Sequence, residues 1–176
     1  MKLELKSVKI SLSQSEETTA FTGILCVNGQ KVANVSNAGR GGANIVYPVK
    51  VSDAGLVKQA DEYCKTLPPV KDDEYGELPM DLEFWISLEI DKIVEVQSQQ
   101  KFLKKLEKAT LKGIAVGNPN DLLAGYKILK LSTPVANYFL SKTGVEMLKK
   151  LITSVKSKLL PGEQILNTNI PSELLK

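Results

Sequence analysis

Alternation of apolar and polar residues dominates the first 36 residues of the chain and predicts three β-strands. The first covers Lys2 to Leu12, the second Thr18 to Val27, and the third Lys31 to Ser36. Successive side chains of a strand point to opposite faces, so a half-buried strand shows a period of two. The phase slips near Lys6-Ser7, which indicates a β-bulge in the first strand.

The dipeptide Asn28-Gly29 lies between the second and third predicted strands. Both residue types accept the positive φ angles of a type I′ turn, so Asn-Gly between two apolar runs is a strong hairpin signal. A two-residue loop pairs Val27 with Gln30. It then predicts Leu25 opposite Val32 and Ile24 opposite Ala33.

Apolar residues recur at helical spacing in three later segments. A helix is expected from Ser52 or Asp53 to about Thr66, with Val57, Ala60, Cys64 and Leu67 on its inner side. A second, long helix follows Asp81, with Trp85 in the core, and either continues past Ser98 or breaks there. A third follows the sequence Thr143-Gly144-Val145-Glu146, which has the pattern of a capping box.

Shorter apolar runs at 45–49, 113–116, 126–131 and 164–167 are candidates for further strands, and the region 113–141 stays undecided between strand and helix. Strands come first and helices later, which favours an α+β fold. We expect an N-terminal antiparallel hairpin or meander sheet packed against two or three amphipathic helices. The whole chain, 1–176, is expected to be a single domain. The acidic segment 70–79, expected to be a mobile and solvated loop, is the only candidate internal boundary.

The composition narrows the classes of function. Histidine is absent, which removes the commonest general base and metal ligand, so an enzyme is disfavoured. Cys26 and Cys64 are expected to be buried free thiols, and no metal or cofactor is expected. No apolar run is long enough to span a membrane, and the N-terminus lacks the apolar stretch of a signal peptide. A cytoplasmic location follows as an expectation.

Charge is distributed unevenly along the chain. Residues 1–90 carry 9 basic and 13 acidic groups, a net charge of −4, whereas residues 91–176 carry 14 basic and 7 acidic groups, a net charge of +7. The lysines from Lys101 to Lys112 form a cluster in the basic half. They either coat a solvated helix face or contact the phosphates of a nucleic acid.

Of the 23 basic residues, 22 are lysine, and the single arginine is Arg40 in the sequence Gly39-Arg40-Gly41-Gly42. Glycines allow consecutive backbone N–H groups to form an anion nest, and arginine adds a planar, bidentate fork. The predicted ligand-binding residues are Asn37, Gly39, Arg40, Gly41, Gly42 and Asn44. The alternative is a tight structural crossover in which Arg40 pairs with a carboxylate of the protein itself.

Three segments of the first 45 residues carry a resemblance: residues 15–21 (SEETTAF), residues 27–32 (VNGQKV) and residues 37–42 (NAGRGG). Together they resemble a set of small, uncharacterised proteins of bacteriophages and mobile elements. The resemblance implies a phage or mobile-element origin, with a location in the host cytoplasm. It implies no activity and no site.

These observations favour a non-catalytic binding protein that recognises a phosphate-bearing, nucleotide-like small anion or an acidic host protein through the Arg40 loop. For a phage-encoded chain, such a protein is expected to act on host defence. One alternative is a structural or protein-interaction accessory protein without a ligand. Another is a nucleic-acid binder that uses the basic half. The oligomeric state stays open.

Overall fold

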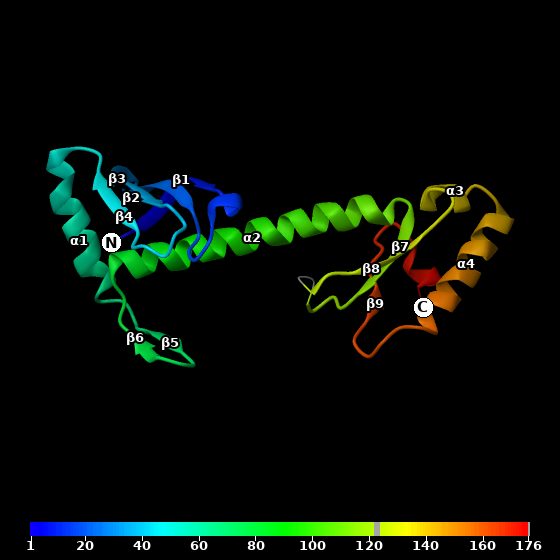
Figure 1. Cartoon of the computed structure of the whole chain (residues 1–176). Helices are drawn as coiled ribbons and strands as arrows, with labels where there is room; N and C mark the ends of the chain where they lie inside the picture. The colour runs from blue at the N-terminus through cyan, green and yellow to red at the C-terminus, as the bar shows by residue number, and fades with distance from the viewer. Residues whose placement is uncertain (122–123, 176) are drawn as a thin grey trace. The chain divides into compact units, whose positions relative to one another are not determined.

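The computed structural model describes residues 1–121 and 124–175 and has an α+β fold (Figure 1). It divides into two compact units, Met1–Glu95 and Val96–Lys176. The sequence predicted one domain with a candidate boundary at 70–79. The division instead falls inside a helix, where no loop composition marks it, and residues 70–79 belong to the first unit.

The N-terminal unit is built on a four-stranded antiparallel sheet in the order β1-β2-β3-β4 (Figure 1). The strands are β1 (Leu3–Ile10), β2 (Phe21–Val27), β3 (Gln30–Asn37) and β4 (Ile45–Pro48). The predicted bulge in β1 is confirmed: the pairing with β2 shifts between Lys6 and Lys9, and Ser7 has a φ of 52°. A short 3-10 helix, η1 (Leu12–Gln14), follows β1.

The predicted β2–β3 hairpin is confirmed, with φ angles of 48° at Asn28 and 86° at Gly29. Val27 pairs with Gln30 as expected, but the register then shifts, so Leu25 lies opposite Ala33 and not opposite Val32. The same shift places Ile24 opposite Asn34, so both inner pairings predicted from the sequence are wrong. A bulge causes the shift and lets two consecutive residues of β3 be buried, since Val32 and Ala33 are both fully buried.

Two helices complete the core of this unit. After the 3-10 turn η2 (Val51–Asp53) comes α1 (Ala54–Cys64), and α2 (Leu82–Thr110) is one uninterrupted helix of 29 residues. The cap predicted for α2 is present, because Asp81 Oδ1 accepts a hydrogen bond of 2.7 Å from the amide of Phe84. One hydrophobic cluster joins sheet and helices, and its fully buried members include Leu25, Val32, Cys64, Ile86 and Ile90.

The acidic segment 70–79 is not a structureless loop, as its composition suggested, but a small hairpin. Its strands are β5 (Val70–Asp72) and β6 (Gly76–Leu78). Asp72 Oδ1 accepts hydrogen bonds from the amides of Glu74 (2.9 Å) and Tyr75 (2.8 Å), and Gly76 supplies a positive φ. The carboxylate of Asp72 therefore stabilises this turn, a role that the composition of the segment does not reveal.

The C-terminal unit has a three-stranded antiparallel sheet in the order β8-β7-β9. Its strands are β7 (Gly113–Gly117), β8 (Lys127–Lys130) and β9 (Gln164–Ile165), and its helices are α3 (Val135–Tyr138) and α4 (Lys142–Lys156), with a terminal 3-10 turn η4 (Ser172–Leu174). Ile114, Leu148 and Ile152 are buried in its core. The cap of α4 is Ser141 and not Thr143, because the Ser141 hydroxyl accepts from the amide of Gly144 at 3.0 Å.

Both cysteines are buried and free, as predicted. Burial, assisted by the nearby charges of Asp61 and Asp81, raises the pKa of Cys64 to about 11. Trp85 is half-buried and packs against the core of the N-terminal unit. Among the described residues, no helix combines the length and the apolar character that crossing a membrane requires.

Candidate functional site

The glycine-rich loop connects β3 to β4, and a single side chain organises it. Asn37 is buried at the end of β3, and its Oδ1 accepts hydrogen bonds from the Gly39 amide (2.8 Å) and the Thr18 hydroxyl (2.9 Å). Its Nδ2 donates to the carbonyl of Gly42 (2.8 Å) and to Asn44 Oδ1 (3.0 Å). With two donated and two accepted bonds, Asn37 fixes the loop along most of its length.

Gly39 is required by the fold. Its φ is +84°, and a Cβ at this position would meet the carbonyl oxygen of Gln14 and lie 2.8 Å from Ala20 Cβ. Its own carbonyl accepts hydrogen bonds from the amides of Glu16 (2.8 Å) and Glu17 (3.1 Å). The segment before β2 therefore wraps closely around Gly39, which leaves no space for a side chain.

The two glycines after Arg40 differ from each other. Gly41 has a φ of +79°, and a Cβ there would meet the carboxylate of Glu17. Gly42 has an ordinary φ, and an added Cβ would meet nothing within 4 Å. The backbone conformation thus explains why Gly39 and Gly41 are glycines, but it does not explain why Gly42 is one.

The predicted anion nest requires backbone amides of the loop that are free to donate hydrogen bonds. The amide of Gly39 donates to Asn37 Oδ1, and the amide of Gly41 donates to the hydroxyl of Thr18 at 3.3 Å. Both donors are therefore engaged inside the loop. An anion at this loop would depend on the charge of Arg40 more than on these two backbone groups.

Arg40 lies between the two structural glycines and is exposed. Among the described residues, no carboxylate forms an ion pair with its guanidinium, and no side-chain hydrogen bond holds it. The alternative interpretation of the sequence was that Arg40 pairs with a carboxylate of the protein itself. The described residues offer no such pair.

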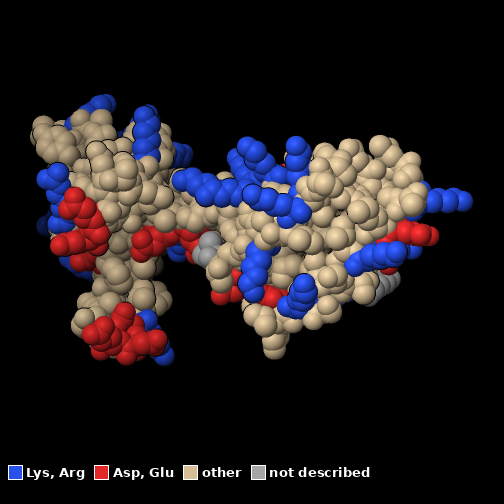
Figure 2. Space-filling view, turned by 45° about the vertical axis from the view of Figure 1, so that its right-hand side comes forward, with Lys and Arg blue, Asp and Glu red and all other residues tan. Residues whose placement is uncertain are grey.

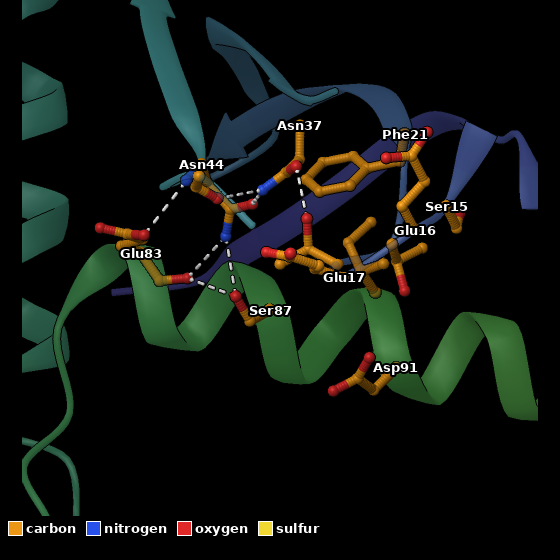
Figure 3. Close-up of a pocket in the computed structure, with 13 residues that line it drawn as sticks. Ser15, Glu16, Glu17, Phe21, Asn37, Asn44, Glu83, Ser87 and Asp91 are labelled. Atoms are coloured by element: carbon orange, nitrogen blue, oxygen red, sulfur yellow. Dashed lines mark hydrogen bonds between the residues drawn. The ribbon is translucent and has the colours of Figure 1, made fainter. Parts of the chain in front are cut away.

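Asn44 joins the other end of the loop to helix α2 (Figure 3). Its backbone amide donates to Glu83 Oε1 at 3.1 Å, and its Nδ2 donates to the Glu83 carbonyl (3.1 Å) and to the Ser87 hydroxyl (2.8 Å). The loop is thus anchored at Asn37 on the sheet and at Asn44 on the helix.

An open pocket of about 520 Å³ lies between this loop, the segment before β2 and helix α2 (Figure 3). Glu83, Ser87 and Asp91 face it from one side of α2, because positions i, i+4 and i+8 share a helix face. Its lining residues are Ser15, Glu16, Glu17, Thr18, Thr19, Phe21, Asn37, Gly42, Asn44, Glu83, Ser87, Ile90 and Asp91.

The pocket is acidic. Glu16, Glu17, Glu83 and Asp91 contribute four carboxylates, and no lysine or arginine is among the lining residues. Coulomb repulsion therefore disfavours a phosphate inside the pocket, whereas an ammonium, guanidinium or hydroxyl group would be favoured there. Among the described residues, no group of three or more carboxylates and thiols is placed to hold a metal ion.

Three hydroxyl groups of the pocket, those of Ser15, Thr18 and Ser87, are committed to structural hydrogen bonds. Ser15 donates to the carbonyl of Ser11, Ser87 to the carbonyl of Glu83, and Thr18 to the side-chain oxygen of Asn37. A nucleophilic hydroxyl needs a base that takes its proton, and carbonyl and amide oxygens do not serve. These three hydroxyl groups therefore donate to no base.

The structure brings three of the six predicted residues to the pocket: Asn37, Gly42 and Asn44. Gly39 and Gly41 shape the loop, and Arg40 lies outside the lining. Sequence reasoning missed the contribution of α2, because it considered only the apolar side of that helix. The signal was present in the polar residues at Glu83, Ser87 and Asp91, which repeat at helical spacing.

Comparison with models of protein families, with curated proteins and with solved structures gives no match to this chain. Its function is therefore inferred from its own residues.

Proposed function

We propose that this chain is a non-catalytic binding protein that recognises a phosphate-bearing ligand or an acidic partner surface through Arg40. The proposal rests on the exposure of that side chain and on the lack of an ion-pair partner for it among the described residues. Arg40 is the single arginine of the sequence and is exposed, and no described carboxylate pairs with it. A planar guanidinium in this position has its donors available for two oxygens of a carboxylate or a phosphate.

The rigid loop favours binding. The hydrogen bonds of Asn37 and the contacts of Gly39 and Gly41 fix the backbone on both sides of Arg40 before any partner arrives. Only the arginine side chain would then lose freedom on binding. Preorganisation of this kind raises affinity, because less conformational entropy is lost when the complex forms.

Of the two classes of partner, the geometry favours an acidic protein surface. Arg40 does not line the pocket, and the pocket beside the loop is itself acidic, so it does not form an enclosed site for a small anion. A protein surface can place a carboxylate against Arg40 and a basic or hydroxyl side chain over Glu16, Glu17, Glu83 and Asp91. Both contacts would then be electrostatically complementary.

The biological setting of this interaction is proposed only from the resemblance of segments within the first 45 residues to small proteins of bacteriophages and mobile elements. On that basis the chain is encoded by a bacteriophage or mobile element, and its partner is a protein of host defence in the host cytoplasm. The proposal of an anion-binding Arg40 does not depend on this setting.

A spectroscopic test follows from the presence of one arginine. In a ¹⁵N-labelled sample of the whole chain, the Arg Nε–H region contains one signal, which belongs to Arg40. Titration with inorganic phosphate, with ATP and with a poly-glutamate peptide is expected to shift this signal saturably with at least one probe. The proposal is overturned if none of the three moves it, or if it changes only linearly, as bulk ionic strength would produce.

A further inference from the structure

The two units of the structure carry net charges of opposite sign. Residues 1–95 carry 10 basic and 15 acidic groups, a net charge of −5, and residues 96–176 carry 13 basic and 5 acidic groups, a net charge of +8. All 13 basic residues of the C-terminal unit are lysines. Figure 2 shows lysine side chains spread over this unit.

Four of these lysines share one face of helix α2: Lys101, Lys104, Lys105 and Lys108, called here the lysine face. Their spacing of i, i+3, i+4 and i+7 places them together on one side of a helix. The opposite side is only partly packed inside the unit, since Leu103 there is 50% exposed. Phe102 there forms an edge-on ring contact with Tyr126 at 5.5 Å, and Leu106 is buried.

The lysine face is unneutralised in the free protein. All four side chains are exposed, and among the described residues none of them forms an ion pair or a side-chain hydrogen bond. Like charges at i and i+4 repel each other and destabilise a helix. The helix dipole favours Lys108 in the last turn, but it does not favour Lys101, which lies two turns earlier.

We propose that the lysine face binds the phosphate backbone of a duplex nucleic acid, without regard to base sequence. The four lysines extend over about 10 Å of helix, or about one charge per 3.5 Å. The phosphates of one strand of a duplex advance by about 3.4 Å per nucleotide along the duplex axis, so the lysine face has a comparable charge per unit of axial length. This site lies in the C-terminal unit and does not depend on the function proposed for Arg40.

Two alternatives fit the lysine face less well. Proteins that bind single strands stack bases on aromatic side chains, but the lysine face carries none, and Phe102 is occupied by Tyr126. Helices that lie on membranes place a broad apolar face beside their lysines. Here Leu106 is buried within the unit and Leu103 is half exposed, so the apolar strip beside the lysines is narrow. Lysine alone supplies phosphate attraction, which fits a sequence-independent duplex contact.

The test is fluorescence anisotropy with a labelled duplex of scrambled sequence and the full-length protein over a range of salt concentrations. The binding constant is expected to fall linearly with salt on logarithmic axes, with a slope of up to about −3.6 for four phosphate contacts. In K104E/K108E the affinity is expected to drop at least about tenfold, and the slope is expected to become shallower by about 1.8. The milder K104Q/K108Q keeps the test valid if charge reversal disturbs folding.

The matched control is K149E/K150E, which makes the same charge change at two exposed lysines of helix α4. It is expected to bind within about twofold of the wild type, because only diffuse attraction is altered. Arg40→Ala is expected to bind the duplex unchanged. The inference is overturned if no binding occurs at low salt or if both double variants lose affinity equally. It is also overturned if phosphatidylserine vesicles, but not the duplex, bind through the lysine face.

Discussion

The side-chain amide of Asn44 donates a hydrogen bond of 2.8 Å to the hydroxyl of Ser87, 43 residues further along the chain. This bond ties the end of the glycine-rich loop to helix α2. Asn44 also accepts a hydrogen bond of 3.0 Å from Asn37, so sheet, loop and helix are connected through two asparagine side chains. Arg40 is presented to solvent from a loop that is fixed at both ends.

Replacement of Asn37 by aspartate is expected to destabilise the N-terminal unit. Both hydrogen bonds donated by Nδ2 would be lost, and a carboxylate oxygen would face the Gly42 carbonyl and Asn44 Oδ1. We expect a loss of about 2–4 kcal/mol in the free energy of unfolding, because buried oxygens would be left opposed. Urea denaturation measures it. The control is Asn34→Asp, at an exposed position of the same strand, and equal losses in both variants would contradict this account.

The glycines of the loop are expected to respond differently to alanine. Gly39→Ala introduces a Cβ against the Gln14 carbonyl at a positive φ, and we expect a destabilisation of about 1–3 kcal/mol. Gly42→Ala has open space and an ordinary φ, so its stability should match or slightly exceed that of the wild type. Thermal denaturation of the two variants tests whether Gly42→Ala is the more stable of the two. A reversed order would mean that the loop has a different conformation.

Much of the fold is predictable where local chemistry decides it. Asn28-Gly29 specifies its own turn, and Asp81 specifies the start of α2. The register of β2 and β3 beyond the turn is not decided by local sequence. It depends on the burial of two consecutive residues, Val32 and Ala33, which the alternation of apolar and polar residues does not predict. The division into two units lies inside a continuous helix, where the sequence contains no boundary signal.

The candidate site shows the same contrast. Its loop is visible in the sequence, because three glycines and the single arginine stand together. The pocket is not, because its walls join Glu16 and Glu17 to Glu83 and Asp91, which are more than sixty residues away along the chain. Only the packing of α2 beneath the sheet brings these carboxylates together.

The acid stability of the chain is expected to depend partly on Asp61. The Lys65 ammonium at 2.8 Å, with a further hydrogen bond from the Leu82 amide at 3.1 Å, lowers the pKa of Asp61 in the folded state. A lowered pKa contributes stability above the unfolded value, about 3.9, and this contribution is lost as the pH falls through the folded pKa.

Asp61→Asn should therefore be less stable than the wild type at pH 6, and this difference should vanish toward pH 2. The difference is expected to stay below about 1 kcal/mol, because this partly exposed ion pair is screened by solvent. Urea denaturation across this pH range measures it, with the exposed Asp73→Asn as control. A difference that does not change with pH would show that Asp61 acts through packing and not through its charge.

The thiol of Cys64 is expected to be inert in the native protein. Its pKa is raised to about 11, mainly by burial, so at pH 8 only about one thiol in a thousand is ionised. In Cys26→Ser, which leaves Cys64 as the single thiol, labelling with a thiol reagent at pH 8 should occur only as fast as the protein opens. Rapid and complete labelling before unfolding would contradict the buried position.

Native mass spectrometry of the protein as purified from cells tests the role of Arg40 most directly. We expect the wild type to carry an extra mass, either a small anion or a bound protein. That mass should disappear in Arg40→Ala, decrease in Arg40→Lys, where the bidentate fork is lost, and persist in Lys31→Ala, an exposed control on the same sheet. A wild type without added mass, or a mass retained in Arg40→Ala, would contradict the proposal that this arginine holds the partner.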